Sequence, residues 1–220
     1  MAAMPALTTW WTMDVRALQP QAHHYAVQAS AADLLARWTE PARCYHTTRH
    51  LVEVFWALEE LELAGEIDDR QCSLARLAAW FHDAVYLPGA SHGSNEADSA
   101  ALARDQLTEV GLGDKDIDAI DAMIRLTVNH DAHHEEPLET AFQDADLWIL
   151  SAPVERFDEY CDQVRQEYAA LSHPAYRRGR TTILEALVHR DTIYRTSHAL
   201  HHWETPARIN LGRELTRLRA

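Results

Sequence analysis

Apolar residues recur with the spacing of an α-helix along almost the whole of this chain. After Tyr45 the apolar positions are 51, 54, 55, 58 and 61, which share one face of a helix. The stretch 114–129 repeats this pattern at positions 117, 120, 123, 124 and 128. No stretch shows a convincing alternation of period two between hairpin turns, as a sheet would require. The sequence therefore predicts an all-α fold.

Prolines and glycines stand where these helices are expected to begin and end. Pro41 precedes the first strong helix, Gly65 and Gly111 follow helices, and Pro153 and Pro174 fall in first turns. No repeat or linker divides the chain, so we predict a single domain, residues 1–220, with eight or more helices. The expected helices are one from Tyr45 onward, Arg70–Phe81, Asn95–Val110, Asp114–Asn129, Leu138–Leu150, Val154–Leu171, Tyr176–Val188 and Glu204–Leu218.

The composition limits the possible partners. Of 220 residues, 47% are hydrophobic and 25% charged, as in an ordinary globular protein. The longest apolar runs are far shorter than the ~20 residues of a membrane helix, and we find no signal peptide. A net charge of -14 disfavours extended nucleic acid, because its phosphate backbone would be repelled. We therefore expect a cytoplasmic protein that binds neither membranes nor long nucleic acids.

Several common catalytic motifs are missing from the sequence. Lys115 is the only lysine, and there is no glycine-rich phosphate loop, no G-x-S-x-G and no H-E-x-x-H. Cys44, Cys72 and Cys161 form no C-x-x-C pair, so we expect reduced, partly buried thiols. These absences direct attention to the 14 histidines and the acidic residues.

Three segments combine ionisable residues with apolar helices. The pair His82-Asp83 ends an apolar helix, although a chain of this composition contains about one His-Asp pair by chance. A metal ion would relieve the cost of burying both groups; a histidine that caps the helix is the alternative. His50 lies beside an apolar stripe, and we expect it to share a helix face with His46. Asp144 and Asp146 stand at the head of an apolar segment, where helix capping explains one aspartate well and both less well.

In this order and spacing, the segments resemble the HD-domain superfamily of metal-dependent phosphohydrolases, and more narrowly its bacterial group of predicted HD phosphohydrolases. The resemblance covers residues 45–151, the expected HD core, on which helices within 153–220 would pack. It implies an all-α bundle. The motifs are Tyr45-His46-x-x-x-His50, Phe81-His82-Asp83-x-x-Tyr86, Asn95-Glu96-x-x-Ser99-Ala100, Ile124-x-x-Thr127-x-x-His130 and Asp144-Ala145-Asp146-Leu147.

The resemblance implies which residues hold the metal. The family's ligands fall on His50, His82, Asp83 and Asp146, and Asp144 would be a neighbouring carboxylate that orients a ligand histidine. We expect one divalent ion, with Mn, Fe, Co, Ni, Zn and Mg all open.

The resemblance also implies catalytic residues near the metal. Asp83 or Glu96 would accept a proton from water, and His130 would protonate the leaving oxygen or bind phosphate. The alternative is that Glu96 and His130 only complement helix dipoles at a helix start and a helix end.

Three further residues are candidates for substrate binding. His46 and Arg49 flank His50 and would help to hold an anion, although Arg49 could equally be a surface charge. Asn95 stands where some relatives with two metals have a histidine, which favours a single ion here.

The implied function is hydrolysis of a small phosphate ester, such as a nucleotide, by attack of a metal-bound hydroxide. Two alternatives stay open: a di-iron oxygenase on the same scaffold, and a non-catalytic binding or regulatory module that a metal stabilises. The helices after Pro153 would either complete the pocket or form a contact in a homodimer.

Overall fold

The computed structural model describes residues 3–129 and 136–220 of the chain. Over these residues the predicted all-α fold is confirmed, because the described part contains helices and no strand. Within the same ranges, no helix combines the length and the apolar character needed to cross a bilayer. The helices are α1 (Ala3–Leu18), α2 (His24–Trp38), α3 (Thr48–Leu63), α4 (Asp69–His82), α5 (Ser94–Val110), α6 (Asp114–Leu126), α7 (Pro137–Asp146), the 3-10 helix η1 (Leu147–Ser151), α8 (Val154–Glu167), α9 (His173–Val188), α10 (Ser197–His202) and α11 (Glu204–Arg219).

Helices α1 and α2, which we did not predict, both contribute buried side chains to the core. In α1 the side chains of Leu7, Trp11 and Val15 recur every four residues and are buried. This spacing places them on one face of a helix, so the signal was present in the sequence. Helix α1 packs against α2 and α4 and covers one side of the core.

Several predicted helix bounds differ from the structure by three residues or more, and two of the differences lie next to the predicted metal ligands. Helix α3 begins at Thr48 rather than Tyr45, because the side chain of Thr47 caps it by accepting a hydrogen bond from the amide of Arg49. The predicted helix 138–150 is two helices, since α7 ends at Asp146 and the chain tightens into η1.

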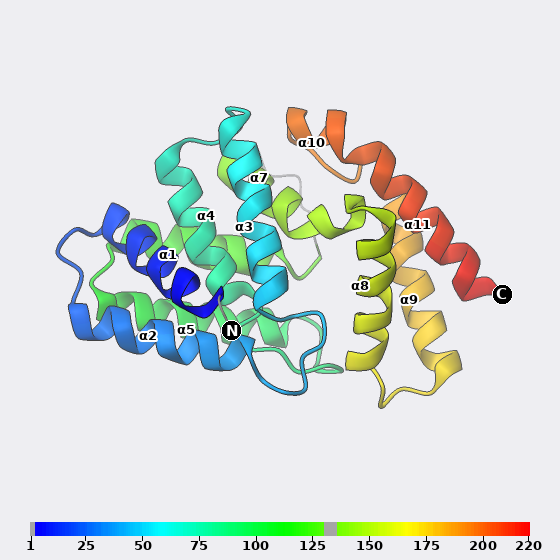
Figure 1. Cartoon of the computed structure of the whole chain (residues 1–220), viewed down its shortest axis with the longest axis horizontal. Coiled ribbons are helices and arrows are strands. Elements are labelled where there is room, and N and C mark those ends of the chain that lie inside the picture. Colours follow the sequence, from blue (N-terminus) through cyan, green and yellow to red (C-terminus); the bar gives the residue numbers. More distant parts are fainter. Residues whose placement is uncertain (1–2, 130–135) are drawn as a thin grey trace.

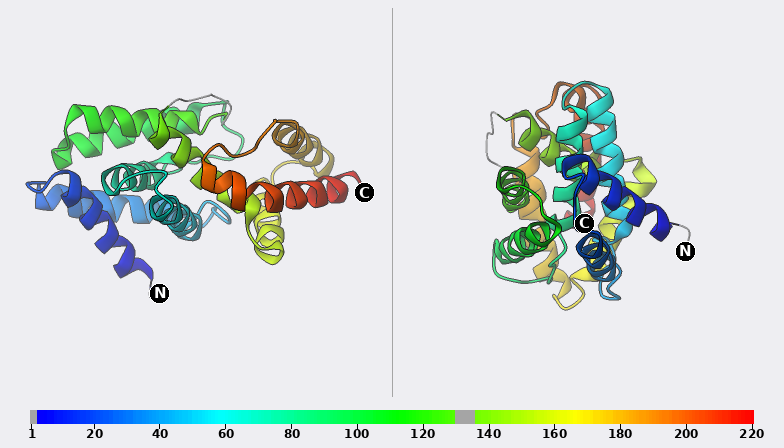
Figure 2. Two further views of the ribbon diagram at one scale, coloured as in Figure 1. Left: turned by 90° about the horizontal axis from the view of Figure 1, so that it is seen from above. Right: turned by 90° about the vertical axis from the view of Figure 1, so that its left-hand side faces the viewer.

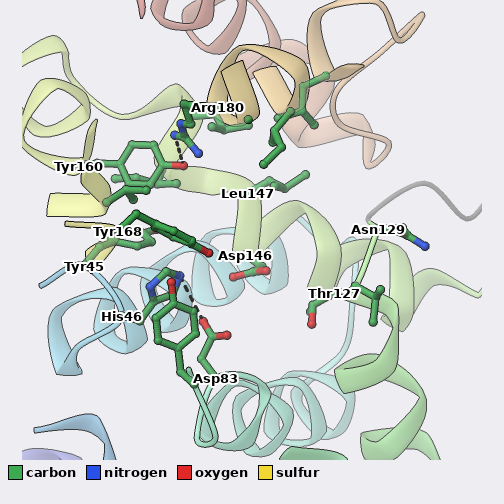
Figure 3. Close-up of a pocket in the computed structure, with 18 of the residues that line it drawn as sticks. Tyr45, His46, Asp83, Thr127, Asn129, Asp146, Leu147, Tyr160, Tyr168 and Arg180 are labelled. Carbon is green, nitrogen blue, oxygen red and sulfur yellow. Dashed lines mark hydrogen bonds and ion pairs between the residues drawn. The ribbon is translucent and has the colours of Figure 1, made fainter. Parts of the chain in front are cut away.

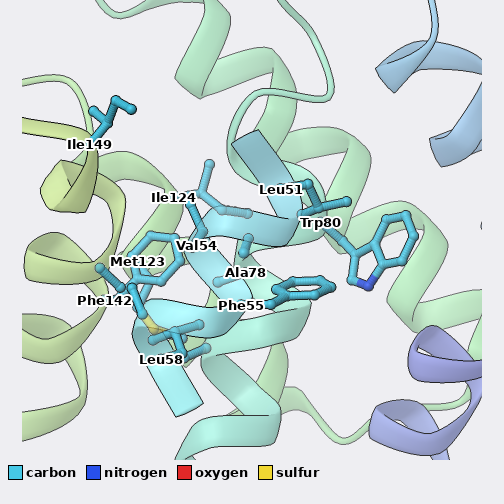
Figure 4. Packing of buried hydrophobic residues seen from close by; sticks show 14 of the residues in the cluster. Leu51, Val54, Phe55, Leu58, Ala78, Trp80, Met123, Ile124, Phe142 and Ile149 are labelled. Carbon is cyan, nitrogen blue, oxygen red and sulfur yellow. The ribbon is translucent and has the colours of Figure 1, made fainter. Parts of the chain in front are cut away.

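Helices α3 and α4 lie side by side at the centre of the part of the molecule formed by α1 to α7 (Figure 1). Figure 4 shows Leu51, Phe55 and Leu58 of α3 among side chains of α4, α6 and α7, with Phe142 close to Leu58. Burial of each large apolar side chain stabilises the fold by about 1.5–3 kcal/mol. This packing holds α3, α4 and α7, the helices that carry the predicted metal ligands, in one place.

Helices α8, α9 and α11 form the other end of the molecule, away from α1 and α2 (Figures 1 and 2). The segment η1 connects the two ends, because α3, α7, α8 and α11 all pack against it. The buried side-chain amide of Asn210 in α11 donates to the carbonyls of Leu150 and Ala152, at 2.9 Å each. These bonds secure the C-terminal helix against the segment that follows α7.

Candidate metal centre

Four side chains from three helices meet at one point beside the core. His50 lies in the first turn of α3, His82 is the last residue of α4, Asp83 follows it, and Asp146 ends α7. Helix α4 ends at His82, because the amide of Ala84 donates a hydrogen bond to the carbonyl of Phe81 and closes a tight turn. The structure thus brings together all four residues that the sequence suggested as metal ligands.

The donor atoms of this group are closely spaced. Nε2 of His50 lies 3.2 Å from Nε2 of His82, and Oδ2 of Asp83 lies 3.0 and 3.7 Å from the His82 and His50 nitrogens. Oδ1 of Asp146 lies 3.2 Å from His50 and 3.3 Å from His82. Each histidine nitrogen therefore faces both carboxylates and the other histidine.

This spacing fits a metal ion. Donors at about 2.1 Å from one ion lie about 3.0 Å apart at right angles and about 3.4 Å apart in a tetrahedron. The donor atoms of His50, His82 and Asp83 lie within 4.8 Å of one another and could hold an ion, and Asp146 adds a fourth donor. Two imidazoles and two carboxylates suit borderline divalent metals.

Both histidines are oriented by a partner on the far side of the ring. Nδ1 of His82 lies 2.8 Å from the carbonyl of Ala79, which can only accept, so Nδ1 carries a proton and Nε2 is the ring nitrogen that faces the carboxylates. Nδ1 of His50 shares a hydrogen bond of 3.0 Å with the hydroxyl of Tyr45. Such partners are typical of metal-binding histidines.

The electrostatics of the group favour a positive charge between the carboxylates. Burial alone would lower the pKa of His82, but Asp83 and Asp146 raise it well above its ordinary value. Burial alone would raise the pKa of Asp83, yet the charge of His82 and the nearby histidines hold it well below its ordinary value. A bound cation would take the place of the proton on His82.

His46 lies in the turn before α3 and not on its face, so the predicted shared helix face with His50 is wrong. Its Nδ1 lies 2.6 Å from Oε2 of Glu167, the last residue of α8, and its Nε2 points to Oδ2 of Asp83 at 3.8 Å. The ring of Tyr86 stacks on the imidazole with centroids 4.0 Å apart. His46 is therefore held at the edge of the metal ligands.

Glu167 holds the turn before α3 in place through hydrogen bonds, a role that the sequence did not predict. Its Oε1 accepts the amides of Cys44, Tyr45 and His46 at 2.7 to 3.0 Å. Burial alone would raise its pKa, but His46 and the backbone amides lower it to about 2. No local sequence signal connects Glu167 with residues 44–46, because 121 positions separate it from His46.

Two predicted substrate-binding residues have other roles in the structure. Arg49 is half exposed and does not line the cavity next to the metal ligands; it pairs with Glu159 at 2.6 Å and with Glu53 at 3.2 Å. Asn95 also lies outside the lining, and its side-chain amide both donates to and accepts from the backbone of Leu87, at 3.2 Å each. Asn95 thus closes the loop between α4 and α5.

Asp144 does not orient a ligand histidine, contrary to the prediction. It accepts hydrogen bonds from the amides of Arg195 and Thr196 and from the Thr196 hydroxyl, at 2.8 to 3.1 Å. Burial raises its pKa to about 6, although these hydrogen bonds oppose the shift. Asp144 lies within the last turn of α7, whereas Asp146 ends α7 and directly precedes the 3-10 helix η1, which its side chain does not cap.

The metal ligands open onto a cavity of about 570 Å³. Glu96 lines this cavity, as predicted for a residue facing the site, and so does His92, which sequence reasoning did not select. The predicted catalytic residue His130 lies outside the described residues. On the other side the lining comes from α8 and α9, so the helices after Pro153 complete the pocket.

The comparisons with known proteins add no family assignment. No protein-family model matches the chain, and a search of curated proteins finds no similar sequence.

Proposed function

We propose that the protein is a metal-dependent phosphohydrolase that acts on a small phosphate ester. The observation that carries the proposal is the convergence of His50, His82, Asp83 and Asp146, with donor atoms 3.0 to 3.7 Å apart, at the wall of a cavity. The volume of about 570 Å³ is in the range of small-molecule sites.

The openness of the group favours catalysis over a purely structural metal. Structural ions are enclosed by protein ligands, whereas catalytic ions keep a position for water or substrate. The two histidines are buried, but the side chains of Asp83 and Asp146 are 18% and 11% exposed. The carboxylate side of the group therefore faces the cavity.

The chain's own residues supply the remaining chemistry. A divalent ion in this group would polarise a phosphoryl oxygen and make water more acidic. Glu96, on the cavity wall, would accept a proton from the attacking water. His46 would hold a proton on Nε2 for the leaving oxygen, since Glu167 fixes its Nδ1 and thus aims Nε2 at the site. Tyr86 keeps the imidazole in this position.

Phosphate release with and without metal tests this function. The purified protein is stripped with a chelator, reloaded separately with each candidate divalent ion, and screened against phosphate mono- and diesters. We expect release only after reloading. The variant Asp146→Asn should lose it, while the matched control Asp158→Asn, at an exposed position of α8, should retain it. Equal release by the stripped protein, or by Asp146→Asn, would overturn the proposal.

A further inference from the structure

The cavity extends from the metal ligands to an arginine on α9. We call His50, His82, Asp83 and Asp146 the metal end, and Tyr160, Tyr176 and Arg180 the arginine end. Both ends line the same cavity. In Figure 3, Arg180 and Asp83 lie at opposite sides of the drawn pocket, with Tyr45, Tyr168 and Leu147 between them.

Arg180 has few partners for a guanidinium inside a protein. Its Nη2 donates to the hydroxyl of Tyr160 at 2.6 Å, and its Cζ lies 5.0 Å from the centroid of that ring. Its buried Nε finds no hydrogen-bond partner among the described residues, and no carboxylate in that part of the chain forms an ion pair with it. The arginine end thus holds a cation without a counterion.

Tyr176 also has a buried polar atom without a described hydrogen-bond partner. The residue is 7% exposed, and its buried hydroxyl has no hydrogen-bond partner in the described ranges. A buried polar group without a partner costs about 1–3 kcal/mol, and an unpaired charge costs more. Two such groups on one cavity wall indicate a ligand that accepts hydrogen bonds and carries negative charge.

The rings of Tyr45 and Tyr160 stand between the metal end and Arg180. Along the wall, the ring of Tyr45 lies 4.7 Å from that of His50, and the ring of Tyr160 lies a further 4.6 Å from Tyr45. The other cavity arginine, Arg190, already donates to the carbonyl of Asn129. Apolar and aromatic side chains, Val164, Tyr168 and Ile183 among them, line the α8 and α9 part of the cavity.

We propose that the substrate is a phosphate ester with a second anionic group, such as a carboxylate. The phosphate would lie at the metal end, an apolar or aromatic part against the tyrosines, and the second anion at Arg180 and Tyr176. This inference rests on the proposed function, since it takes the metal end as the phosphate site. Arg180 then determines specificity rather than chemistry.

Calorimetric binding of phosphonates, which cannot be hydrolysed, tests the second anion site. The probes are phenylphosphonate, 4-phosphonobenzoate and the longer 4-(phosphonomethyl)phenylacetate, added to metal-loaded and to chelated protein. We expect at least one carboxylated probe to bind about tenfold or more tightly than phenylphosphonate, as a charge-assisted hydrogen bond would provide. The variant Arg180→Gln should remove this gain, and the control Arg178→Gln, an exposed arginine of the same helix, should keep it.

A second variant tests the same site in case Arg180→Gln fails to fold. Tyr176→Phe keeps the ring, removes a hydroxyl that has no described partner, and should weaken the carboxylated probe a few-fold without lowering the melting temperature. Metal-dependent binding of phenylphosphonate with no gain from either carboxylate would overturn the second anion site alone. If phenylphosphonate binds equally tightly to metal-loaded and to chelated protein, the proposed function is overturned, and this inference with it.

Discussion

The two ends of the cavity differ in how their polar atoms are partnered. At the metal end, both ligand histidines have the second ring nitrogen in a hydrogen bond, to Ala79 or Tyr45. At the arginine end, Arg180 and Tyr176 each keep a buried polar atom without a described partner. The fold itself therefore orients the metal end, whereas the arginine end keeps polar atoms that the proposed second anion would partner.

The largest expected effect comes from removing a ligand at the metal end. His82→Ala should lose the bound metal and lower phosphate release roughly 1000-fold, because the remaining donors no longer enclose an ion. Elemental analysis and the phosphate assay measure the two losses. His201→Ala, at an exposed histidine bonded only within its own helix, is the control. A His82→Ala protein with normal metal content would show that the ion binds elsewhere.

Asp144→Ala separates an anchoring role from a metal-ligand role. Because Asp144 accepts the amides of Arg195 and Thr196, its loss should lower the free energy of unfolding by about 3 kcal/mol. Chemical denaturation measures this change, and the metal content of the folded fraction should stay normal. Loss of metal without loss of stability would contradict the anchoring role and show that Asp144 acts on the metal site.

Glu167 links α8 to the turn that carries His46, and its effect depends on pH. Its pKa in the folded protein is about 2, below the ordinary value of 4.5, so its stabilisation is full above about pH 4.5 and is lost as the pH falls toward 2. Glu167→Gln should cost about 2 kcal/mol at pH 7 and flatten the stability curve in that range. A curve unchanged by the substitution would contradict this role.

The smallest effect is expected from Tyr45→Phe, which removes the partner of His50. The metal should bind about tenfold more weakly, because the imidazole is less firmly oriented. Competition with a chromogenic chelator measures the affinity. Phe55→Leu changes the core away from the ring nitrogens and serves as the control for a general loss of packing. An equal loss of metal affinity in this control would show that Tyr45 has no specific role.

The sequence was informative where ligands sit at the ends of helices. The resemblance to the HD-domain superfamily indicated the group His50, His82, Asp83 and Asp146, whereas the apolar segments beside these residues indicated only that some of them would be buried. The sequence was misleading for Asp144. Residues two apart on a helix are rotated by about 200° from each other, so Asp144 points away from the side of α7 on which Asp146 lies. It also misled for His46, where the cap at Thr47 starts the helix later than the apolar pattern suggested.

The arginine end could not be predicted from the sequence. Tyr160, Tyr176 and Arg180 belong to ordinary amphipathic helices, and only the packing of α8 against η1 and of α9 against α11 places them on the cavity wall. Glu167 was missed for the same reason, since its contacts with residues 44–46 join opposite parts of the chain. Long-range packing, which leaves no local pattern, determines this half of the site.

Titration of the chelated protein with a divalent transition metal, followed by calorimetry, most directly tests whether four side chains surround one ion. The account predicts one equivalent per chain, lost in His82→Ala and retained in His201→Ala. Absence of binding would contradict it outright. Two equivalents of iron would contradict the single site and favour an oxygenase instead.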